Sequence, residues 1–350
     1  MRRLRTGLGA LALVFLATIG TAEAKDSFKI AWSIYVGWMP WGWAADNGIV
    51  KKWADKYGIE IEVVQINDYV ESINQYTAGG FDGCVMTNMD ALTIPAVGGV
   101  DSTALIVGDF SNGNDGIVSK TAKSVAELKG ESINLVELSV SHYLLARALE
   151  KSGLSEQDVT VVNTSDADIV SVFTGTEDVK NVVTWNPLLS EVAAVPGAQK
   201  LFDSSQIAGE IIDLMVVNTE TLAENPNFGK ALVGAWYETL AIMRGQDEAG
   251  IAARTAMAEA SGTDLAGFDQ QLAATRMFWE PAEAVAFAGS LQLIETMDRV
   301  RNFSNAKGLM GADLDSVGIG FPDEQTLGDA GSIKLRFDDT YLRMAAEGAL

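Results

Sequence analysis

The stretch Ile59–Leu92, IEIEVVQINDYVESINQYTAGGFDGCVMTNMDAL, decides the fold. Its first part, Ile59–Ile66, alternates apolar and polar residues and predicts a strand. Tyr69–Ala78 has the spacing of a helix, and Phe81–Met86 is a short apolar run that is typical of a buried strand. The same rhythm begins earlier, with a strand and a helix expected at Phe28–Trp32 and Trp41–Tyr57. Strands and helices that alternate in this way predict a parallel sheet with helices on both faces.

A second unit repeats this pattern at a spacing of 97 residues. Identical residues recur without a gap at this offset, namely Val64 and Val161, Thr77 and Thr174, Val85 and Val182, Thr87 and Thr184, and Leu92 and Leu189. The expected elements are strands at Ser132–Glu137, Val159–Val162 and Val179–Thr184, with helices at Ser139–Ser152 and Asp168–Phe173. We therefore expect two copies of one α/β unit, facing each other across a cleft at the carboxyl ends of their strands.

Two polar stretches are placed to carry the chain between the two units. Asp109–Gly116 is rich in glycine and asparagine, and Asp203–Gly209 leads into the apolar strand Glu210–Val217. We predict one lobe from residues 25–116 and 208–350 and a second lobe from residues 117–207. The last third of the chain has helical patterns with alanine-rich faces and should pack on the first lobe.

Residues 1–24 have the pattern of a secretory signal peptide. A basic start is followed by a short apolar run and by Ala22-Glu23-Ala24, so Lys25 is the expected mature N-terminus. A transmembrane anchor is the alternative, but the apolar run is too short to cross a bilayer. No cysteine lies at the cleavage site to take a lipid, and with Cys84 alone no disulfide can form within the chain. We expect a soluble protein of the periplasm.

Composition argues against several other classes. The formal charge of −22 becomes −24 once residues 1–24, with three arginines and Glu23, are removed. So acidic a chain should avoid nucleic acid and anionic membranes, and it mildly favours a cationic ligand. His142 and Cys84 are the only residues of their kinds, which leaves no His- or Cys-based metal site and no nucleophile–base pair. We expect no enzyme activity, no cofactor and no metal.

Aromatic and polar residues gather where the predicted strands end. Trp32, Tyr35 and Trp38 follow the first strand, and Trp185 follows the last strand of the second unit, opposite Asn88 by the repeat. Two aromatic faces suit a flat or cationic ligand, although packing within the core is the plain alternative. Polar residues at strand and helix ends complete the predicted site, with helix capping as their alternative role: Asp68, Asp115, Glu137, Ser139 and Asp213.

Several motifs resemble those of the nitrate/taurine-type substrate-binding proteins of ABC transporters. They are Ala126-Glu127-Leu128-Lys129-Gly130, the run Tyr143–Leu154, Gly79-Gly80-Phe81-Asp82 and Trp185-Asn186-Pro187. The segments Tyr35–Trp41, Lys52–Ile59, Met86–Asp90 and Ser111–Asp115 are similar to a subgroup of urea-carboxylase-associated binding proteins. The resemblance implies a periplasmic-binding-protein fold with two hinge crossings, a monomer that closes on its ligand, and a membrane permease as partner.

The subgroup implies guanidinium as the ligand, with urea as the older assignment. Guanidinium is planar and always charged, and in-plane carboxylates between two indole faces would hold it. Urea or another small nitrogen or sulfonate compound is the alternative ligand. An enzyme on the same fold and a module that senses the ligand without transporting it are the alternatives from other classes.

Overall fold

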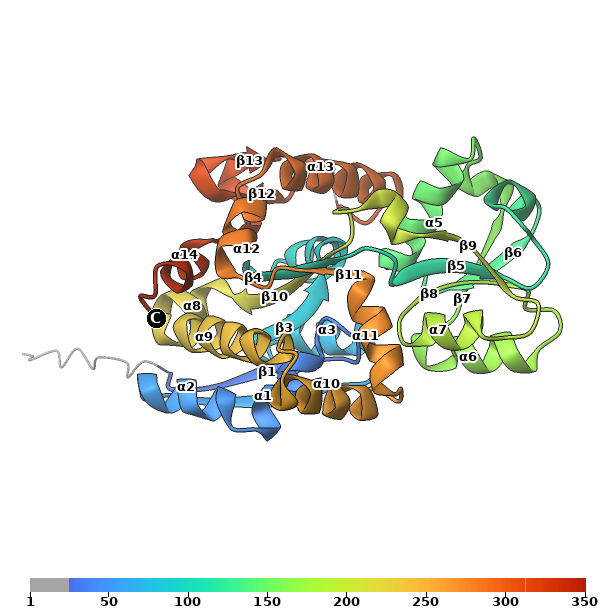
Figure 1. Cartoon of the computed structure of the whole chain (residues 1–350). Coiled ribbons are helices and arrows are strands. Elements are labelled where there is room, and N and C mark those ends of the chain that lie inside the picture. The colour runs from blue at the N-terminus through green and yellow to red at the C-terminus, as the bar shows by residue number, and fades with distance from the viewer. Residues whose placement is uncertain (1–24, 312) are drawn as a thin grey trace, which may run out of the picture.

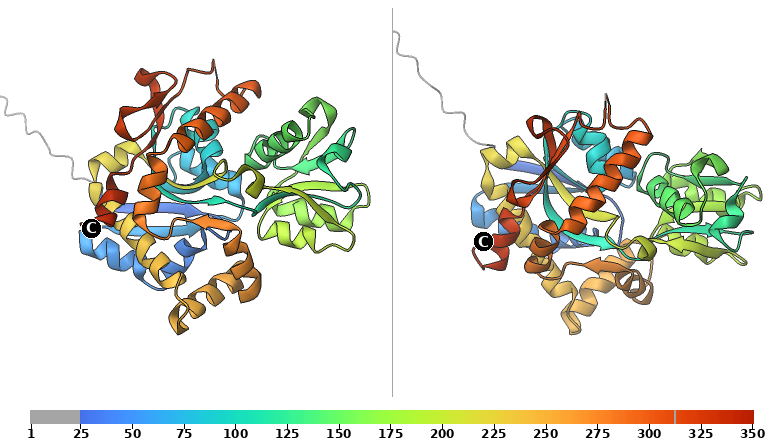
Figure 2. Two further views of the ribbon diagram at one scale, coloured as in Figure 1. Left: turned by 45° about the horizontal axis from the view of Figure 1, so that its top comes forward. Right: turned by 90° about the horizontal axis from the view of Figure 1, so that it is seen from above.

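The computed structural model describes residues 25–311 and 313–350. The predicted signal peptide, residues 1–24, lies outside the described residues. Figures 1 and 2 show two lobes of unequal size, joined by extended segments that run through the middle of the molecule. Within the described ranges, none of the helices combines the length and the apolar character needed to cross a membrane.

The larger lobe is built on a nine-stranded mixed sheet. Its order is β13-β12-β14-β4-β10-β3-β1-β2, and β11 pairs with β4. β1 is parallel to β2 and β3, while β10 runs antiparallel to both β3 and β4. The strands are β1 (Ser27–Trp32), β2 (Glu60–Gln65), β3 (Gly83–Thr87), β4 (Ser102–Ser111), β10 (Ile212–Asn218), β11 (Thr275–Met277), β12 (Gly318–Gly320), β13 (Thr326–Leu327) and β14 (Ile333–Phe337).

The smaller lobe contains a five-stranded sheet in the order β7-β6-β8-β5-β9. β6 is parallel to β7 and β8, and β5 is antiparallel to β8 and β9. These strands are β5 (Asp115–Ser119), β6 (Ser132–Leu135), β7 (Thr160–Asn163), β8 (Asn181–Trp185) and β9 (Gln199–Asp203). The predicted α/β class with two lobes is confirmed. In each lobe an antiparallel strand is added to the parallel strands, namely β10 in the larger lobe and β5 in the smaller one.

Helices flank both sheets. Those of the larger lobe are α1 (Met39–Asp46), α2 (Ile49–Tyr57), α3 (Tyr69–Thr77), α4 (Asn88–Ala91), α8 (Thr219–Glu224), α9 (Pro226–Met243), α10 (Glu248–Ala260), α11 (Leu265–Ala273), α12 (Pro281–Ala288), α13 (Leu291–Ala306) and α14 (Thr340–Ala346). Those of the smaller lobe are α5 (Val140–Lys151), α6 (Asp166–Gly175) and α7 (Leu188–Ala193). The single helix predicted over Trp41–Tyr57 is wrong. Gly48 adopts a left-handed conformation with φ 74° and divides it into α1 and α2.

The elements of the two units fall at equivalent positions of the repeat. α3 begins at Tyr69 and α6 begins at Asp166, and both are preceded by a residue whose side chain caps the helix. Strands β3 and β8 likewise end at Thr87 and Trp185, within one residue of the 97-residue offset. The repeat seen in the sequence therefore corresponds to one strand–helix–strand unit in each lobe.

The chain passes from the larger sheet to the smaller one between β4 and β5, and it returns between β9 and β10. Ser204 ties the two crossings together. Its Oγ lies 2.6 Å from the Oγ of Ser111 and accepts a hydrogen bond from the backbone nitrogen of Gly113 over 2.7 Å. β5 already belongs to the smaller sheet at Asp115, two residues before the predicted boundary at 117. The lobe boundaries at 117 and 207 stay predictions.

Candidate functional site

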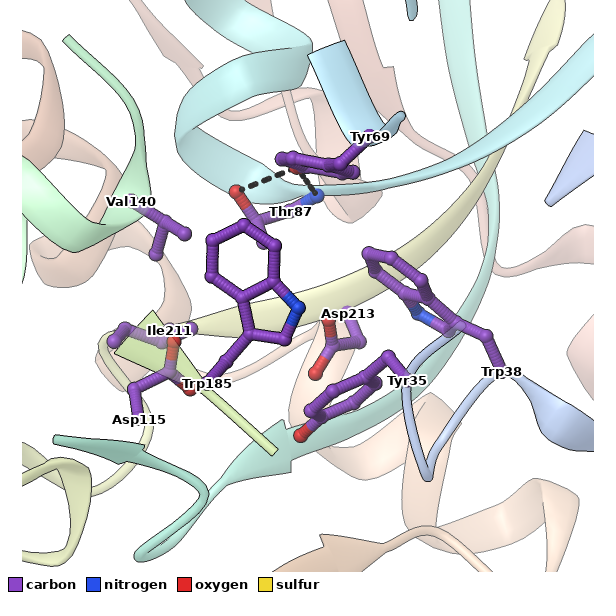
Figure 3. Close-up of a pocket in the computed structure, with 9 residues that line it drawn as sticks. All are labelled: Tyr35, Trp38, Tyr69, Thr87, Asp115, Val140, Trp185, Ile211 and Asp213. Atoms are coloured by element: carbon purple, nitrogen blue, oxygen red, sulfur yellow. Dashed lines mark hydrogen bonds between the residues drawn. The ribbon is translucent and has the colours of Figure 1, made fainter. Parts of the chain in front are cut away.

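A small cavity lies between the lobes. Its walls come from the larger lobe, from the smaller lobe and from the segment that leads into β10 (Figure 3). None of the lining residues is more than 7% exposed, so the lobes are closed around the space. The lining residues are Tyr35, Trp38, Tyr69, Thr87, Asp115, Val140, Trp185, Ile211 and Asp213.

Four aromatic rings form a continuous wall. Tyr35 meets Trp38 edge to face with ring centroids 5.1 Å apart, and Trp38 stacks on Tyr69 at 5.6 Å. Tyr69 in turn meets the ring of Trp185, from the smaller lobe, at 5.7 Å. Edge-to-face and stacked pairs of this kind are favourable geometries, so the wall holds its shape without a ligand. Closure of the lobes completes it, because Trp185 reaches it only from the other lobe.

The loop after β1 brings two of these rings to the cavity. The backbone nitrogen atoms of Trp38 and Met39 both donate to the carbonyl oxygen of Tyr35, which makes a tight turn into α1. Gly37 is required within this turn, because a Cβ there would lie 2.5 Å from a carboxylate oxygen of Asp109. The glycine lets the backbone approach the carboxylate closely. This turn therefore positions Tyr35 and Trp38 beside the acidic side of the cavity.

Three neighbouring strands place polar side chains in one row. Asp213 of β10 is opposite Thr87 of β3 on one side and opposite Asp109 of β4 on the other. Asp109 and Asp213 are both buried, and both oxygens of Asp109 and Oδ2 of Asp213 have no hydrogen-bond partner among the described residues. Two buried carboxylates side by side are unfavourable when both are ionised, because each has lost its water and repels the other. Asp109 and Asp213 are therefore the electrostatically least favourable part of the site.

The smaller lobe adds a third carboxylate. Asp115, at the start of β5, is paired across the sheet with Trp185, at the end of β8. The next residue, Asn186, holds this edge in place by donating from Nδ2 to Oδ1 of Asn114 over 2.7 Å. Asp115 and Trp185 therefore enter the cavity as a fixed pair when the lobes close.

Burial raises the pKa of every carboxyl group around the cavity. It raises the pKa of Asp109 and that of Asp115 to about 7, with the charges of neighbouring carboxylates adding to the effect. The pKa of Asp213 is raised well above its usual value, first by burial and then by the charge of Asp109. Behind the aromatic wall, burial raises the pKa of Asp90 to about 6, although hydrogen bonds from Tyr69 and Thr87 oppose this. The cavity is thus lined by carboxyl groups whose pKa values are raised, and none of its lining residues is basic.

Tyr69 also organises the inner end of the site. Its hydroxyl donates to Oδ2 of Asp90 over 2.6 Å and accepts from the backbone nitrogen of Thr87 over 3.0 Å. The hydroxyl of Thr87 donates to the same Asp90 oxygen over 2.8 Å. This network fixes the Tyr69 ring between those of Trp38 and Trp185.

Five of the ten residues predicted from the sequence line the cavity, namely Tyr35, Trp38, Asp115, Trp185 and Asp213. The other five do not. Trp32 is buried against Gly42 of α1, outside the cavity. Asp68 is exposed and caps α3 by accepting from the backbone nitrogen of Glu71, and Glu137 is exposed. The predicted position of these three residues in the cleft is therefore corrected. Trp32 packs on α1, Asp68 caps a helix, and Glu137 is exposed to solvent.

Asn88 and Ser139 do not line the cavity but contact segments that do. Asn88 donates from Nδ2 to the carbonyl oxygen of Glu210 and accepts from the backbone nitrogen of Ile212, so it braces the start of β10. Ser139 caps α5 by accepting from the backbone nitrogen of Ser141, next to the lining residue Val140. Both therefore position lining residues without lining the cavity themselves.

The sequence interpretation missed Tyr69, Thr87, Val140, Ile211 and, at the rear wall, Asp109. Tyr69 and Thr87 could have been found, because the first begins a helix and the second ends a strand at the same sheet edge. The sequence pattern places Asp109 in a polar crossing, but the residue belongs to β4 and is fully buried. Its position beside the cavity depends on the pairing of β4 with β10, which places it next to Asp213.

The arrangement suits the binding of a small ligand between the lobes. None of the nine lining residues is basic, and none is a histidine or cysteine that could act as a base or nucleophile. In the part of the chain that the structure describes, no group of three or more metal-ligating side chains is placed to hold a metal ion. The fold and the closed interlobe cavity define a substrate-binding protein of the periplasmic-binding-protein class.

The chain belongs to the NMT1/THI5 like family, whose model matches residues 48–249. A protein of Brucella abortus (strain 2308) that carries the provisional name of a binding protein is 26% identical over 235 residues, which are 64% of this chain and 69% of the relative. The name of this relative agrees with the prediction of a binding protein.

Solved structures share the fold at low sequence identity. The alkanesulfonate-binding protein SsuA of Xanthomonas axonopodis pv. citri, bound to MOPS, has a TM-score of 0.66 at 19% identity, covering 83% of this chain and 96% of its own. The periplasmic nitrate-binding protein NrtA of Synechocystis PCC 6803 has a TM-score of 0.58 at 12% identity, covering 93% and 99%. These similarities confirm the predicted periplasmic-binding-protein fold.

Proposed function

We propose that this protein is the periplasmic substrate-binding component of an ABC importer, and that its ligand is guanidinium or a closely related small planar cation. The observation that carries the proposal is the pairing of buried carboxylates with an aromatic wall in one closed cavity. Asp115 and Asp213 line the space, and Asp109 lies directly beside Asp213. No basic side chain among the lining residues offsets this charge.

An anionic ligand fits this cavity poorly. Sulfonate and nitrate, which the named structural relatives bind, would need donors or basic residues to replace their water. Here the polar wall consists of carboxyl oxygens, and an anion beside them would be both desolvated and repelled. A cation instead supplies the missing partner charge, and the rings of Trp38, Trp185, Tyr35 and Tyr69 present faces and edges that favour it.

Guanidinium also matches the shape and the hydrogen bonding of the site. It is flat, it donates in its own plane, and it pairs with a carboxylate through two parallel hydrogen bonds. The oxygens of Asp213 and Asp109 that have no partner among the described residues are acceptors for such donors. Urea, the alternative, has the same shape but is neutral, so its hydrogen bonds to the carboxyl oxygens lack the charge assistance that guanidinium provides.

The route of closure follows from the two crossings. We infer that the lobes, residues 25–116 with 208–350 and residues 117–207, turn about the segments that Ser204 ties together. In the open form Trp185 and Asp115 would move away from Tyr69 and Asp213, which exposes the cavity. The closed form would then be the one that docks on the membrane permease.

Calorimetry on the mature chain tests the ligand. We expect heat with guanidinium at neutral pH and none with nitrate or methanesulfonate. Asp213→Asn should weaken guanidinium binding by about a hundredfold or more, since it removes one partner of a buried charge pair. Glu137→Gln is the matched control, because this carboxylate is exposed, and it should bind like the parent.

Two results would redirect the proposal. Binding of nitrate or methanesulfonate without guanidinium binding would overturn the cation assignment. Urea binding as strong as guanidinium binding, with little change in Asp213→Asn, would favour the neutral ligand. Thermal melting of each variant shows that it is folded.

A further inference from the structure

The pair Asp109 and Asp213 is the most unusual feature of the site. The two residues are direct cross-strand partners on β4 and β10 and both are buried, at 0% and 3% exposure. Cross-strand partners on one face have their Cβ atoms about 4.5–5.5 Å apart, so two ionised carboxylates in these positions repel each other strongly. Neither oxygen of Asp109 meets a donor among the described residues, and neither does Oδ2 of Asp213.

Among the described residues, those that line the cavity and the space behind the pair carry no positive charge that could neutralise it. Asp115 on β5 adds a further negative charge from the smaller lobe, and Tyr35 from the loop before α1 is a neutral neighbour. A small chamber behind the pair is walled by the apolar and aromatic residues Trp38, Trp41, Val85, Ile106, Gly108, Leu214, Met215 and Trp236. No Lys, Arg or His lines the cavity or this chamber, so a proton is the simplest neutralising partner.

We propose that the ligand-free site keeps one proton shared between the carboxyl groups of Asp109 and Asp213, and that an entering guanidinium displaces it. The inference rests on the proposed function and adds to it that binding is coupled to proton release. In the exchange an O–H bond of the shared carboxyl pair breaks and its proton leaves to solvent. The N–H groups of the cation then donate to the freed carboxylate oxygens, so that one positive charge replaces another.

Charge balance supports the exchange. If the pair kept its proton, the bound cation would leave an uncompensated positive charge in the site. The protonated carboxyl group would also have one oxygen occupied by its own hydrogen and could accept fewer hydrogen bonds from the cation. If the pair were fully ionised before binding, two buried negative charges would lie side by side without a partner. Burial and mutual repulsion keep the ligand-free pair protonated near neutral pH, and a bound cation reverses both effects.

Two measurements on the mature chain test the proposal. Calorimetric titrations with guanidinium, in buffers of different ionisation enthalpy, report the number of protons released. We expect about one proton per ligand near pH 7 and an affinity that rises up to about tenfold per pH unit between pH 6 and pH 8. Asp109→Asn should cut both the proton release and the pH dependence by more than half, while Glu137→Gln leaves them unchanged.

Infrared difference spectroscopy of the ligand-free protein examines the proton independently of the ligand. Asp109→Asn should weaken the signal of protonated carboxyl groups near neutral pH and leave the part that comes from Asp115, whose pKa burial also raises to about 7. Guanidinium binding without proton release, or a release that survives in Asp109→Asn but disappears in Asp115→Asn, overturns the shared proton and leaves the proposed function standing. A protonated carboxyl signal without guanidinium binding at any pH overturns the proposed function instead.

Discussion

The backbone nitrogen of Tyr69 lies 3.5 Å from a carboxylate oxygen of Asp166, across the interface between the two lobes. Each residue is the first of a helix, α3 in the larger lobe and α6 in the smaller one, and the two are related by the 97-residue repeat. The internal repeat thus brings equivalent helix starts face to face when the lobes close. The contact places a negative charge at the positive end of α3.

This contact should favour the closed form. Asp166→Asn removes the charge and should weaken guanidinium binding about two- to thirtyfold, because a partly buried interaction with a helix end contributes about 0.3–2 kcal/mol. Asp68→Asn should do the reverse, since burial and then the charge of Asp68 raise the pKa of Asp166. Asparagine retains the capping hydrogen bond of α3. Equal effects of the two variants, measured by tryptophan fluorescence titration, would contradict this view.

The ligand-free protein should lose stability as pH rises from about 4 to 7. The pKa values of Asp109 and Asp115, raised to about 7 by burial, exceed the usual value of 3.8, so the native state binds more protons than the unfolded state in this window. One raised pKa unit is about 1.4 kcal/mol, and we expect a total loss above about 2 kcal/mol. Thermal melting from pH 4 to pH 8 measures it. Asp115→Asn should flatten the profile, and a melting temperature that is constant or rises with pH would contradict the prediction.

A second contact between the lobes lies at the end of α13. Glu156 of the smaller lobe accepts hydrogen bonds at one oxygen from Lys307 and His142, each over 2.5 Å, and the ring of Phe303 packs edge-on against Tyr143 at 5.3 Å. Burial raises the pKa of Glu156, but the bonds from His142 and Lys307 outweigh this and lower it. The contact should help to hold the closed form.

Lys307→Ala should therefore weaken guanidinium binding, but by no more than about fivefold, because a partly exposed ion pair contributes about 1 kcal/mol or less. Lys129→Ala is the matched control, since Lys129 pairs with Asp158 within the smaller lobe. The two variants are compared by calorimetry. A loss of affinity in Lys129→Ala as large as in Lys307→Ala would assign the effect to surface charge and not to closure.

Gly234 in the middle of α9 should resist substitution although alanine favours helices. A Cβ at this position would overlap the ring of Trp53 on α2, which is held by a hydrogen bond to Glu238. We expect Gly234→Ala to destabilise the protein by about 1–3 kcal/mol in spite of a gain in helix propensity. Gly175→Ala, at the end of α6 with open space around it, should be neutral or stabilising. Thermal melting that shows equal effects would contradict the packing argument.

Tyr69 should contribute through both its hydroxyl and its ring. Tyr69→Phe leaves Asp90 with fewer donors and should cost about 1–3 kcal/mol of stability. Tyr69→Ala also removes the ring between Trp38 and Trp185, so it should weaken guanidinium binding well beyond Tyr69→Phe. Thermal melting and calorimetry separate the two effects. Equal affinities of the two variants would exclude the ring from the binding site.

Local patterns in the sequence were enough for most elements and for part of the site. Alternation and apolar runs determine strands such as β2 and β8, and the repeat shows that the lobes share a unit. Aromatic residues after strands indicated Tyr35, Trp38 and Trp185, all of which line the interlobe cavity. Trp32 was misplaced because a strand side chain can face either side of a sheet, and the sequence does not say which side α1 covers.

The acidic centre of the site was decided by the tertiary structure alone. Asp109 and Asp213 are far apart in the sequence, and each by itself resembles a solvated or capping residue. The register between β4 and β10 makes them buried neighbours, and closure of the lobes adds Asp115. The sequence by itself determined two α/β units and an aromatic strand edge, because these depend on local periodicity. Pairing of distant strands depends on long-range packing, and it alone turned separate carboxylates into one site.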